Sequence, residues 1–258
     1  MAQMKQVTRI NQIYDVLKEK GNASTRYLCS LFGVSESTIR RDIEVLSAER
    51  EDVNRVHGGV VLDTDRAGLE YMFELKVNFN ADYKRRIAEV VIELIQDGDT
   101  FVLDSGSTCL EVARQLHKRQ KLRVVTTDIK IAEELGKHES IETYVTGGAV
   151  RPGYYTLGDS IAAEVLDHFR VGRAIMSADA IDIEKGITNI TTFEVGVKKK
   201  IIEMCDDIVL VADHTKFGKT SFYRIADLSS ISTIVTTADI DPRIRREIEA
   251  MGIPLRLA

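Results

Sequence analysis

The chain has few cysteines, no long apolar run and no excess of basic charge. Its three cysteines, Cys29, Cys109 and Cys205, are far apart and form no C-x-x-C pair, which argues against a disulfide framework and against a zinc site. The longest apolar strand-like run, Ile208 to Ala212, is far too short to cross a membrane, and no apolar segment typical of a secretion signal follows Met1. We therefore expect a cytoplasmic protein with no membrane partner, no metal and no cofactor.

Length and composition are those of an ordinary soluble protein. Hydrophobic residues make up 44% and charged residues 29% of the 258 residues, enough for a small domain beside a larger one. The net charge of −5 is unevenly distributed, because residues 1–57 contain nine Lys and Arg against eight Asp and Glu, and the remainder contains 26 against 32. The acidity therefore belongs to the larger C-terminal part.

The segment from Val34 to Leu46 has the pattern of a DNA recognition helix. Aliphatic residues spaced i, i+4 and i+7 make one apolar stripe: Ile39, Ile43 and Leu46. Around the opposite face lie hydroxyl and guanidinium groups suited to phosphates and base edges: Ser37, Thr38, Arg40 and Arg41. Ser35 occupies the position of an N-cap, and we include it among the predicted DNA contacts.

A second short helix is predicted from Thr25 to Phe32, ended by a turn at Gly33, so the two form a helix-turn-helix unit. In such a unit the second helix enters the major groove with its N-terminal half. The alternative is an ordinary amphipathic helix with solvated arginines. The hydroxyls beside Arg40 and Arg41, with apolar residues confined to the far side, favour DNA contact. A first helix is expected over Arg9 to Lys20.

The segment from Asp52 to Leu62 favours a β-hairpin wing. Alternating residues precede the pair Gly58-Gly59, which suits a tight turn and would place Arg55 and His57 beside the duplex. We therefore assign residues 1–62 to a winged helix-turn-helix domain that binds double-stranded operator DNA. Because residues 1–57 are only weakly basic, we expect modest affinity per monomer and a homodimer or homotetramer that supplies the rest.

These motifs carry a family resemblance. The T-I-R-R-D core that begins at Thr38, followed by R-x-H-G-G from Arg55, resembles the N-terminal domain of the DeoR family of bacterial transcription regulators. The family usually has a Gly in the turn after the recognition helix, whereas this chain has the acidic segment Ala48–Asp52. Carboxylates near a phosphate backbone are repelled, so we expect a displaced or weaker wing.

Residues 63–82 lack a clear period, and we assign them to a linker. From Tyr83 onward a helical segment is followed by short β-branched runs that alternate with helical stretches. The expected strands are Thr100–Leu103, Arg123–Thr126, Thr143–Thr146, Ala174–Met176, Ile208–Val211 and Thr233–Thr236. This alternation predicts an α/β domain over residues 83–258 with a mainly parallel sheet and covering helices.

The loop after the first of these strands has the composition of a phosphate cradle. A Gly lets the backbone approach an anion, hydroxyls donate, and the free N–H groups of a helix start favour negative charge. The residues are Asp104, Ser105, Gly106, Ser107 and Thr108. A simple strand-to-helix turn capped by Ser and Thr is the alternative for this loop taken alone.

Loops after later strands provide companions to this cradle. Together they offer hydroxyls, cations and carboxylates that suit a phosphorylated polyol: Thr127 and Asp128, Gly147, Gly148 and Arg151, Asp179, and Asp213 with Lys216. Turn capping by Asp179 and Asp213, and a solvated Lys216, are the competing interpretations. In open α/β sheets the carboxyl ends of the strands form the ligand site, so we expect these loops to converge.

The same loops match the family. D-S-G-S-T, T-T-D, G-G-x-x-R and A-D-x-x-K-F-G resemble, in order, the effector-binding motifs of DeoR-type C-terminal domains, whose fold is similar to that of ribose-5-phosphate isomerase. The resemblance covers nearly the whole chain and implies a regulator, usually a repressor, of sugar catabolism under the control of a phosphorylated sugar. Asp128 departs from the family's usual Asn, and Met176-Ser177 from its Gly-rich strand end, so we expect an atypical ligand.

Two other functions remain as alternatives. The segment Ser177 to Asp182, with Lys185-Gly186 after it, faintly resembles the catalytic loop of the phosphosugar isomerase. A dedicated DNA-binding head is needless for an isomerase, so we expect no enzyme activity. The second alternative is an architectural DNA-binding protein without any small-molecule ligand.

Overall fold

The computed structural model describes residues 6–50, 52–56, 58–62 and 73–258. The chain divides into two compact units, Met1–Phe79 and Asn80–Ala258. Of the expected linker, residues 63–72 lie outside the described residues. The remainder includes helix α4 (Phe73–Asn78) and the start of helix α5 (Ala81–Glu93).

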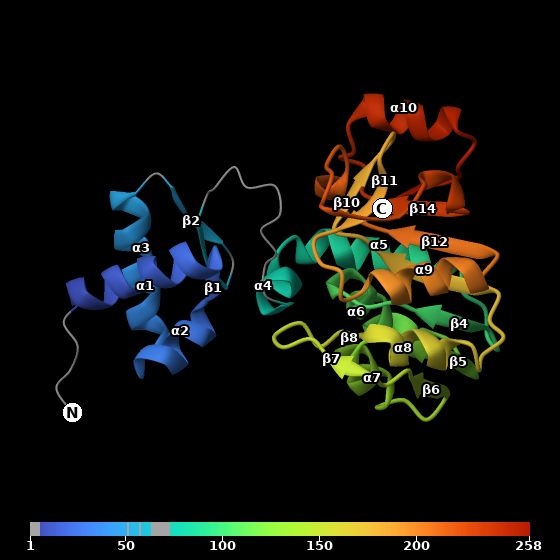
Figure 1. The fold of residues 1–258 in the computed structure, drawn as a ribbon, viewed down its shortest axis with the longest axis horizontal. Helices are drawn as coiled ribbons and strands as arrows, with labels where there is room; N and C mark the ends of the chain where they lie inside the picture. Colours follow the sequence, from blue (N-terminus) through green and yellow to red (C-terminus); the bar gives the residue numbers. More distant parts are fainter. Residues whose placement is uncertain (1–5, 51, 57, 63–72) are drawn as a thin grey trace. The chain divides into compact units, whose positions relative to one another are not determined.

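Apart from α4, the described residues of the N-terminal unit form three helices and a small antiparallel sheet (Figure 1). The elements are α1 (Gln6–Lys20), β1 (Asn22–Ser24), α2 (Thr25–Phe32), α3 (Glu36–Glu49), β2 (Val53–Val56) and β3 (Gly59–Leu62). The predicted helix-turn-helix and hairpin are confirmed, since α2 and α3 flank the turn at Gly33 and β2 pairs with β3. Strand β1, which also pairs with β3, was not expected.

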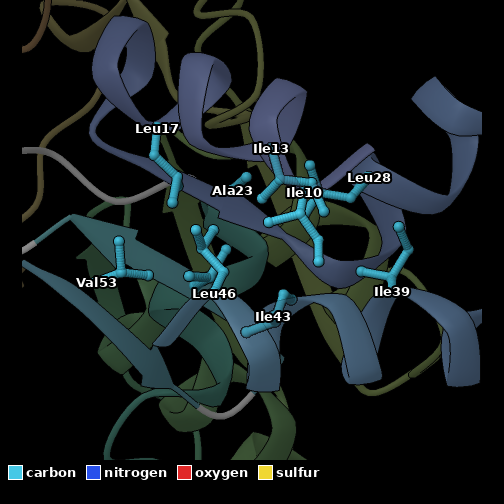
Figure 2. Packing of buried hydrophobic residues seen from close by; sticks show 10 residues of the cluster. Ile10, Ile13, Leu17, Ala23, Leu28, Ile39, Ile43, Leu46 and Val53 are labelled. Atoms are coloured by element: carbon cyan, nitrogen blue, oxygen red, sulfur yellow. The ribbon is translucent and has the colours of Figure 1, made fainter. Parts of the chain in front are cut away.

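The core of this unit is a single aliphatic cluster drawn from all three helices and the sheet (Figure 2). Ile13 and Leu17 of α1 are fully buried, and so are Leu28 of α2 and Ile39 of α3. Ile39 belongs to the stripe predicted from spacing, and its burial fixes which face of α3 is left for solvent.

The C-terminal unit is built on a seven-stranded sheet in which every neighbouring pair is parallel. The order is β15-β14-β12-β9-β4-β5-β6. The strands are β4 (Thr100–Leu103), β5 (Leu122–Thr126), β6 (Ile141–Val145), β9 (Arg173–Ser177), β12 (Asp207–Val211), β14 (Thr233–Thr236) and β15 (Leu255–Leu257). All six expected strands are present, and the predicted parallel sheet is confirmed.

Crossover handedness places the helices on two faces of this sheet. From β4 the chain moves through α6 (Ser107–Gln115), β5 and α7 (Ile129–Leu135) to β6. From β9 it moves the opposite way through α9 (Val195–Met204) and β12, and later through α10 (Pro242–Ala250) to β15. Because such crossovers are right-handed, the two groups of helices cover opposite faces, and the direction reverses between β4 and β9.

Smaller elements surround the sheet (Figure 1). They are the ribbon of β7 (Ala149–Val150) and β8 (Leu157–Gly158), the helix α8 (Asp159–Leu166), the antiparallel sheet of β10 (Ala180–Asp182), β11 (Gly186–Asn189) and β13 (Tyr223–Ala226), and the short helix η2 (His214–Lys216). All three cysteines are free thiols. Among the described residues, none of the helices has the length and apolar character needed to span a bilayer.

Candidate functional site

Helix α3 turns its hydroxyl and cationic side chains toward solvent. Ser35 caps the helix, because its Oγ accepts a hydrogen bond from the N–H of Thr38 at 3.3 Å. The Ser37 Oγ lies 3.0 Å from the Ser35 Oγ, and both side chains are exposed. Gly33 closes α2 in the left-handed region at φ 64°, which produces the sharp turn between the helices. The face predicted to meet DNA is thus solvent-accessible.

The two adjacent arginines of α3 differ in their partners. Arg40 is bound to Glu36 one turn earlier, with an Nη2–Oε1 distance of 2.6 Å. Arg41 is exposed and has no acidic partner among the residues that the structure describes. A ligand could therefore approach Arg41 without breaking an ion pair among the described residues, whereas at Arg40 it would displace Glu36.

A buried ion pair that the sequence analysis missed fixes α3 to α1. The Arg9 Nε lies 2.5 Å from the Asp42 Oδ2, and the Arg9 Nη2 lies 3.1 Å from the Asp42 Oδ1. The two side chains are only 7% and 1% exposed, and Gln6 donates a further bond to Asp42 at 3.1 Å. Such a two-point contact sets orientation as well as distance. Asp42 therefore holds the recognition helix in place and faces away from the DNA-facing side.

The hairpin wing forms despite the acidic segment before it. Arg55 lies in β2, opposite Val60, and its side chain is exposed as predicted. Asp52 accepts a hydrogen bond from the Tyr14 hydroxyl at 2.8 Å and lies 3.8 Å from the Arg50 guanidinium. These contacts compensate part of the acidic charge near the wing. His57 lies outside the described residues.

The predicted phosphate cradle lies where the direction of the sheet reverses. Strand β4 ends next to β9, and ligands of open α/β sheets bind at such switch points. The Ser177 N–H, at the end of β9, donates to the Asp104 Oδ2 at 3.2 Å. The Ser177 Oγ donates to the carbonyl oxygen of Ser105 at 2.8 Å. The structure therefore packs the cradle loop against the end of the neighbouring strand.

The turn into α6 requires a glycine. Gly106 has φ 109°, and a Cβ at this position would lie 2.8 Å from the Ser177 Oγ. Helix α6 starts at Ser107 without a side-chain cap, which leaves its first N–H groups directed out of the helix end. Gly106 and Ser107 are half-buried, whereas Thr108 is buried within α6. The accessible part of the cradle is therefore Gly106 and Ser107.

Asp128 accepts a hydrogen bond from a backbone N–H group of the cradle. Its Oδ2 accepts from the Gly106 N–H at 3.3 Å, and its Oδ1 caps α7 by accepting from the N–H groups of Lys130 at 2.7 Å and Ile131 at 3.1 Å. Burial raises the pKa of Asp128 to about 6, although these three backbone hydrogen bonds lower it. The neighbouring Thr127 is also buried. Asp128 thus joins the cradle to α7 and adds an acidic group beside it.

A buried lysine, not predicted from the sequence, neutralises the other cradle carboxylate. The Lys198 ammonium donates to the Asp104 Oδ2 and, at 3.0 Å, to the carbonyl oxygen of Ser177. Both charged side chains are 1% exposed. Burial alone would lower the pKa of Lys198, but the carboxylates of Asp104 and Glu194 outweigh it and hold that pKa above its ordinary value. Lys198 therefore keeps its charge at neutral pH.

Glu194, at the start of α9, connects three further residues at this place. Its Oε2 accepts from the Ser105 Oγ and from the Asn189 Nδ2, each at 3.4 Å. Its Oε1 lies 3.6 Å from the Arg151 Nη1. The Arg151 guanidinium also lies 3.8 Å from the centre of the Tyr154 ring. Arg151, one of the predicted site residues, is thereby linked through Glu194 to Ser105 of the cradle.

The other predicted residues lie on the same edge of the sheet, farther from the cradle. Gly147 and Gly148 follow β6, two strands from β4, and Lys216 lies in η2 after β12, two strands away on the other side. Neighbouring strands are about 4.8 Å apart, so these loops start about 10 Å from the cradle. Asp179 follows β9 and accepts from the Ile190 N–H at 3.2 Å. These four residues therefore belong to the loops around the cradle rather than to the cradle itself.

Of the residues that the sequence analysis missed, Lys198 is indicated by a weak pattern in the sequence. Lys198 is spaced i, i+4 and i+7 with Glu194 and Ile201, so it lies on the buried face of α9. A lysine on an apolar face needs a buried partner, which is a reason to search for one. Asn189 lies at the end of a four-residue strand and carries no comparable pattern.

Family models match both units. A model described as DeoR-like helix-turn-helix domain matches residues 9–66, and a model described as DeoR C terminal sensor domain matches residues 79–238. The second match alone covers more than half of the chain. The recognition helix and the wing fall within the first match, and the cradle and its buried neighbours within the second.

Proteins from Escherichia coli resemble the chain over almost its full length. A strain K12 protein named for transcriptional regulation of the sgc region is 40% identical over 96% of this chain and 95% of that protein. An O157:H7 protein named as a repressor of the aga operon is 30% identical over 96% and 93%. The glycerol-3-phosphate regulon repressor of strain K12 is 32% identical over 91% and 92%.

Among solved structures, a D-ribose-5-phosphate isomerase in complex with phospho-erythronic acid is similar, with 16% identity over 53% of this chain and 54% of that chain and a TM-score of 0.41. The family itself is decided by the two domain models and by the relatives with at least 30% identity over nearly the full length. The chain belongs to the DeoR family of DNA-binding transcriptional regulators.

Proposed function

We propose that this regulator represses a carbohydrate-utilisation operon and that a phosphorylated sugar, bound in the C-terminal unit, changes its affinity for the operator. The observation that carries this proposal is the Gly106 loop at the switch point of the parallel sheet, in a chain that also carries an exposed recognition helix. A relative named as a glycerol-3-phosphate regulon repressor supports an effector that is a small phosphorylated polyol.

On the DNA side, we assign base and phosphate contacts to the exposed residues of α3 and to the wing. Arg41 is the central groove contact, because it is exposed and carries no ion pair among the described residues. Ser35, Ser37 and Thr38 bind phosphates at the start of the helix, and Arg55 binds the backbone from the wing. A homodimer or homotetramer would present two such helices to the two halves of an operator.

On the effector side, we assign the phosphate to the Gly106–Ser107 turn and the start of α6. Arg151 supplies the countercharge, because its guanidinium is already held 3.6 Å from Glu194 beside the cradle. Lys216, in η2 after β12, is the second candidate for this countercharge, and its side chain would have to extend from η2 to the Gly106–Ser107 turn. Asp104 and Asp179 are the carboxylates that we assign to sugar hydroxyls.

The test is thermal unfolding of the full chain against a panel of sugar phosphates. A ligand that binds only the folded protein raises the thermal midpoint with concentration, by about 2.7 kcal/mol in stability at a hundredfold excess over Kd. The same compound should release the protein from its operator in a gel-shift titration. An architectural DNA-binding protein would show no change of midpoint with any member of the panel.

Contacts at the segment that resembles an isomerase loop favour a structural assignment for Asp182. The Asp182 Oδ1 accepts from the N–H groups of Glu184 at 3.0 Å and Lys185 at 2.9 Å, so it caps the turn between β10 and β11. The Lys185 side chain is exposed. Incubation of the purified protein with ribose 5-phosphate should accordingly give no aldose–ketose conversion.

A further inference from the structure

Two buried oxygen atoms beside the cradle, one of a carboxylate and one of an amide, accept no hydrogen bond from the described residues. They are the Asp104 Oδ1 and the Asn189 Oδ1, on side chains that belong to residues only 1% exposed. A buried acceptor without a donor is destabilising, so such atoms mark places where a donor from outside the chain is favourable.

Both oxygens belong to one connected group of side chains. Asn189 and Ser105 donate to the same oxygen of Glu194, each at 3.4 Å. Lys198 donates to the other carboxylate oxygen of Asp104 and lies 3.9 Å from the Glu194 Oε2. The two acceptors are thus linked through Glu194 and Lys198 and lie within the cluster that adjoins the cradle.

The chemistry of each acceptor is fixed by its neighbours. The Glu194 carboxylate accepts the hydrogen bond from the Asn189 Nδ2, so the amide turns its Nδ2 toward Glu194 and leaves its Oδ1 as the open atom. The Asp104 carboxylate is paired with the Lys198 ammonium, and its oxygens are hydrogen-bond acceptors. Neither oxygen can receive a carbonyl or a carboxylate, and both require a donor such as a hydroxyl.

The cluster opens toward solvent on the side of Arg151. Side-chain exposure rises from 1% at Asp104 to 12% at Glu194 and 18% at Arg151. Arg151 therefore forms the outer end and is linked through Glu194 to Ser105, the residue before the half-buried Gly106 turn that we assign to the phosphate. A molecule with its phosphate at this outer end would direct its remaining groups toward the two acceptors.

We propose that Asn189 and Asp104 form a hydroxyl-recognition pair that selects a polyol phosphate and rejects phosphorylated sugar acids. This inference rests on the proposed function, because it takes the phosphate to lie at the Gly106 turn. Asn189 is the specificity residue, since its open amide oxygen supplies an acceptor in a fixed direction. A carboxylate on the ligand would offer no donor to either open oxygen and would lie close to the carboxylates of Asp104 and Glu194, which disfavour it.

The experiment is isothermal titration calorimetry of the full-length wild type and an Asn189→Leu variant. The probes are inorganic phosphate, glycerol 3-phosphate, ribose 5-phosphate, glucose 6-phosphate and 6-phosphogluconate. We expect at least one of the three polyol phosphates to bind the wild type more tightly than inorganic phosphate, and 6-phosphogluconate to bind at least about tenfold more weakly than the tightest of them. In Asn189→Leu that polyol phosphate loses about tenfold or more, while inorganic phosphate keeps its Kd.

Thr192→Val is the matched control, because Thr192 is exposed in the loop that follows Asn189 and its hydroxyl should not matter. Unchanged circular dichroism and unchanged operator affinity exclude misfolding of Asn189→Leu. Equal losses for inorganic phosphate and for the polyol phosphate, no loss for either, or tight binding of 6-phosphogluconate would each overturn the assignment of Asn189.

A last comparison separates this inference from the proposed function. If Ser107→Glu abolishes binding of a polyol phosphate while Asn189→Leu leaves it unchanged, the phosphate site stands and the hydroxyl-recognition pair is wrong. If no phosphate compound binds the wild type, both the proposed function and the pair are overturned.

Discussion

Asp128 should make the stability of the C-terminal unit depend on pH in a direction that is unusual for an aspartate. Its pKa in the folded protein is about 6, raised from an ordinary value of 3.8 chiefly by burial. The folded state therefore binds this proton more tightly than the unfolded state does. It follows that the contribution of Asp128 to stability is fully present below about pH 3.8 and is lost as pH rises through about 6.

The size of the loss follows from the pKa difference of about two units. One unit corresponds to about 1.4 kcal/mol, so ionised Asp128 destabilises the folded chain by about 3 kcal/mol at pH 7 relative to its protonated form. Asp128→Asn removes this ionisation. The amide still accepts at the start of α7 but no longer offers a second acceptor to the Gly106 N–H, a loss of about 1 kcal/mol that does not vary with pH.

The assay is urea unfolding of wild type and Asp128→Asn, followed by circular dichroism at several pH values from about 4 to about 7.5. As pH rises, the free energy of unfolding of the variant should increase relative to that of the wild type. Most of this relative increase should occur below about pH 6.5. Asp241→Asn is the control, because hydrogen bonds from Arg243 lower the pKa of Asp241 below its ordinary value of 3.8. Its own change therefore lies below this pH range, and its difference from the wild type should stay nearly constant across the range. If the difference between the wild type and Asp128→Asn is constant across this range, the reasoning is refuted.

Three further predictions concern the DNA-binding unit and the cradle. Arg41→Ala should lose about 1–3 kcal/mol of operator affinity per half-site in gel-shift titrations at fixed salt, while Lys18→Ala, on α1, should bind nearly as the wild type does. Arg9→Met should destabilise the N-terminal unit by about 3–5 kcal/mol in chemical denaturation, because it leaves Asp42 buried and unpaired, and adding Asp42→Leu should restore most of the loss. Ser107→Glu should keep operator affinity and lose the response to a sugar phosphate that acts on the wild type, and a normal response would contradict the cradle assignment.

The elements that could be predicted are those whose signal is local. The observed strand Thr100–Leu103 and helix Thr25–Phe32 have the predicted bounds, because an apolar run between Gly and Asp residues, or a stripe between a Ser cap and a Gly, defines each within a few residues. Strands Asn22–Ser24 and Leu255–Leu257 were not predicted. Each has only three residues, too few for alternation to distinguish a strand from a loop, and forms because a distant strand offers hydrogen bonds to its backbone.

The same distinction holds for the candidate sites. The cradle could be proposed because its five residues are consecutive, and the recognition face because helical spacing alone orders it. The Lys198–Asp104 pair joins residues 94 positions apart, and the Arg9–Asp42 pair joins residues 33 apart, so sheet order and helix packing decide both. Asn189 was missed for the same reason. Its place in the cluster depends on its hydrogen bond to Glu194, which also accepts from Ser105, and no residue pattern around Asn189 in the sequence indicates these contacts.

The reversal of direction between β4 and β9 also bears on how the protein is made. The bond between Asp104 and Ser177 closes a loop of 73 residues, so the chain must be ordered over a long stretch before this bond forms. The recognition helix needs only the first 79 residues, and these leave the ribosome first. During synthesis, and after any proteolytic cut between the two units, a polypeptide that carries α3 therefore exists without the unit that contains the proposed effector site.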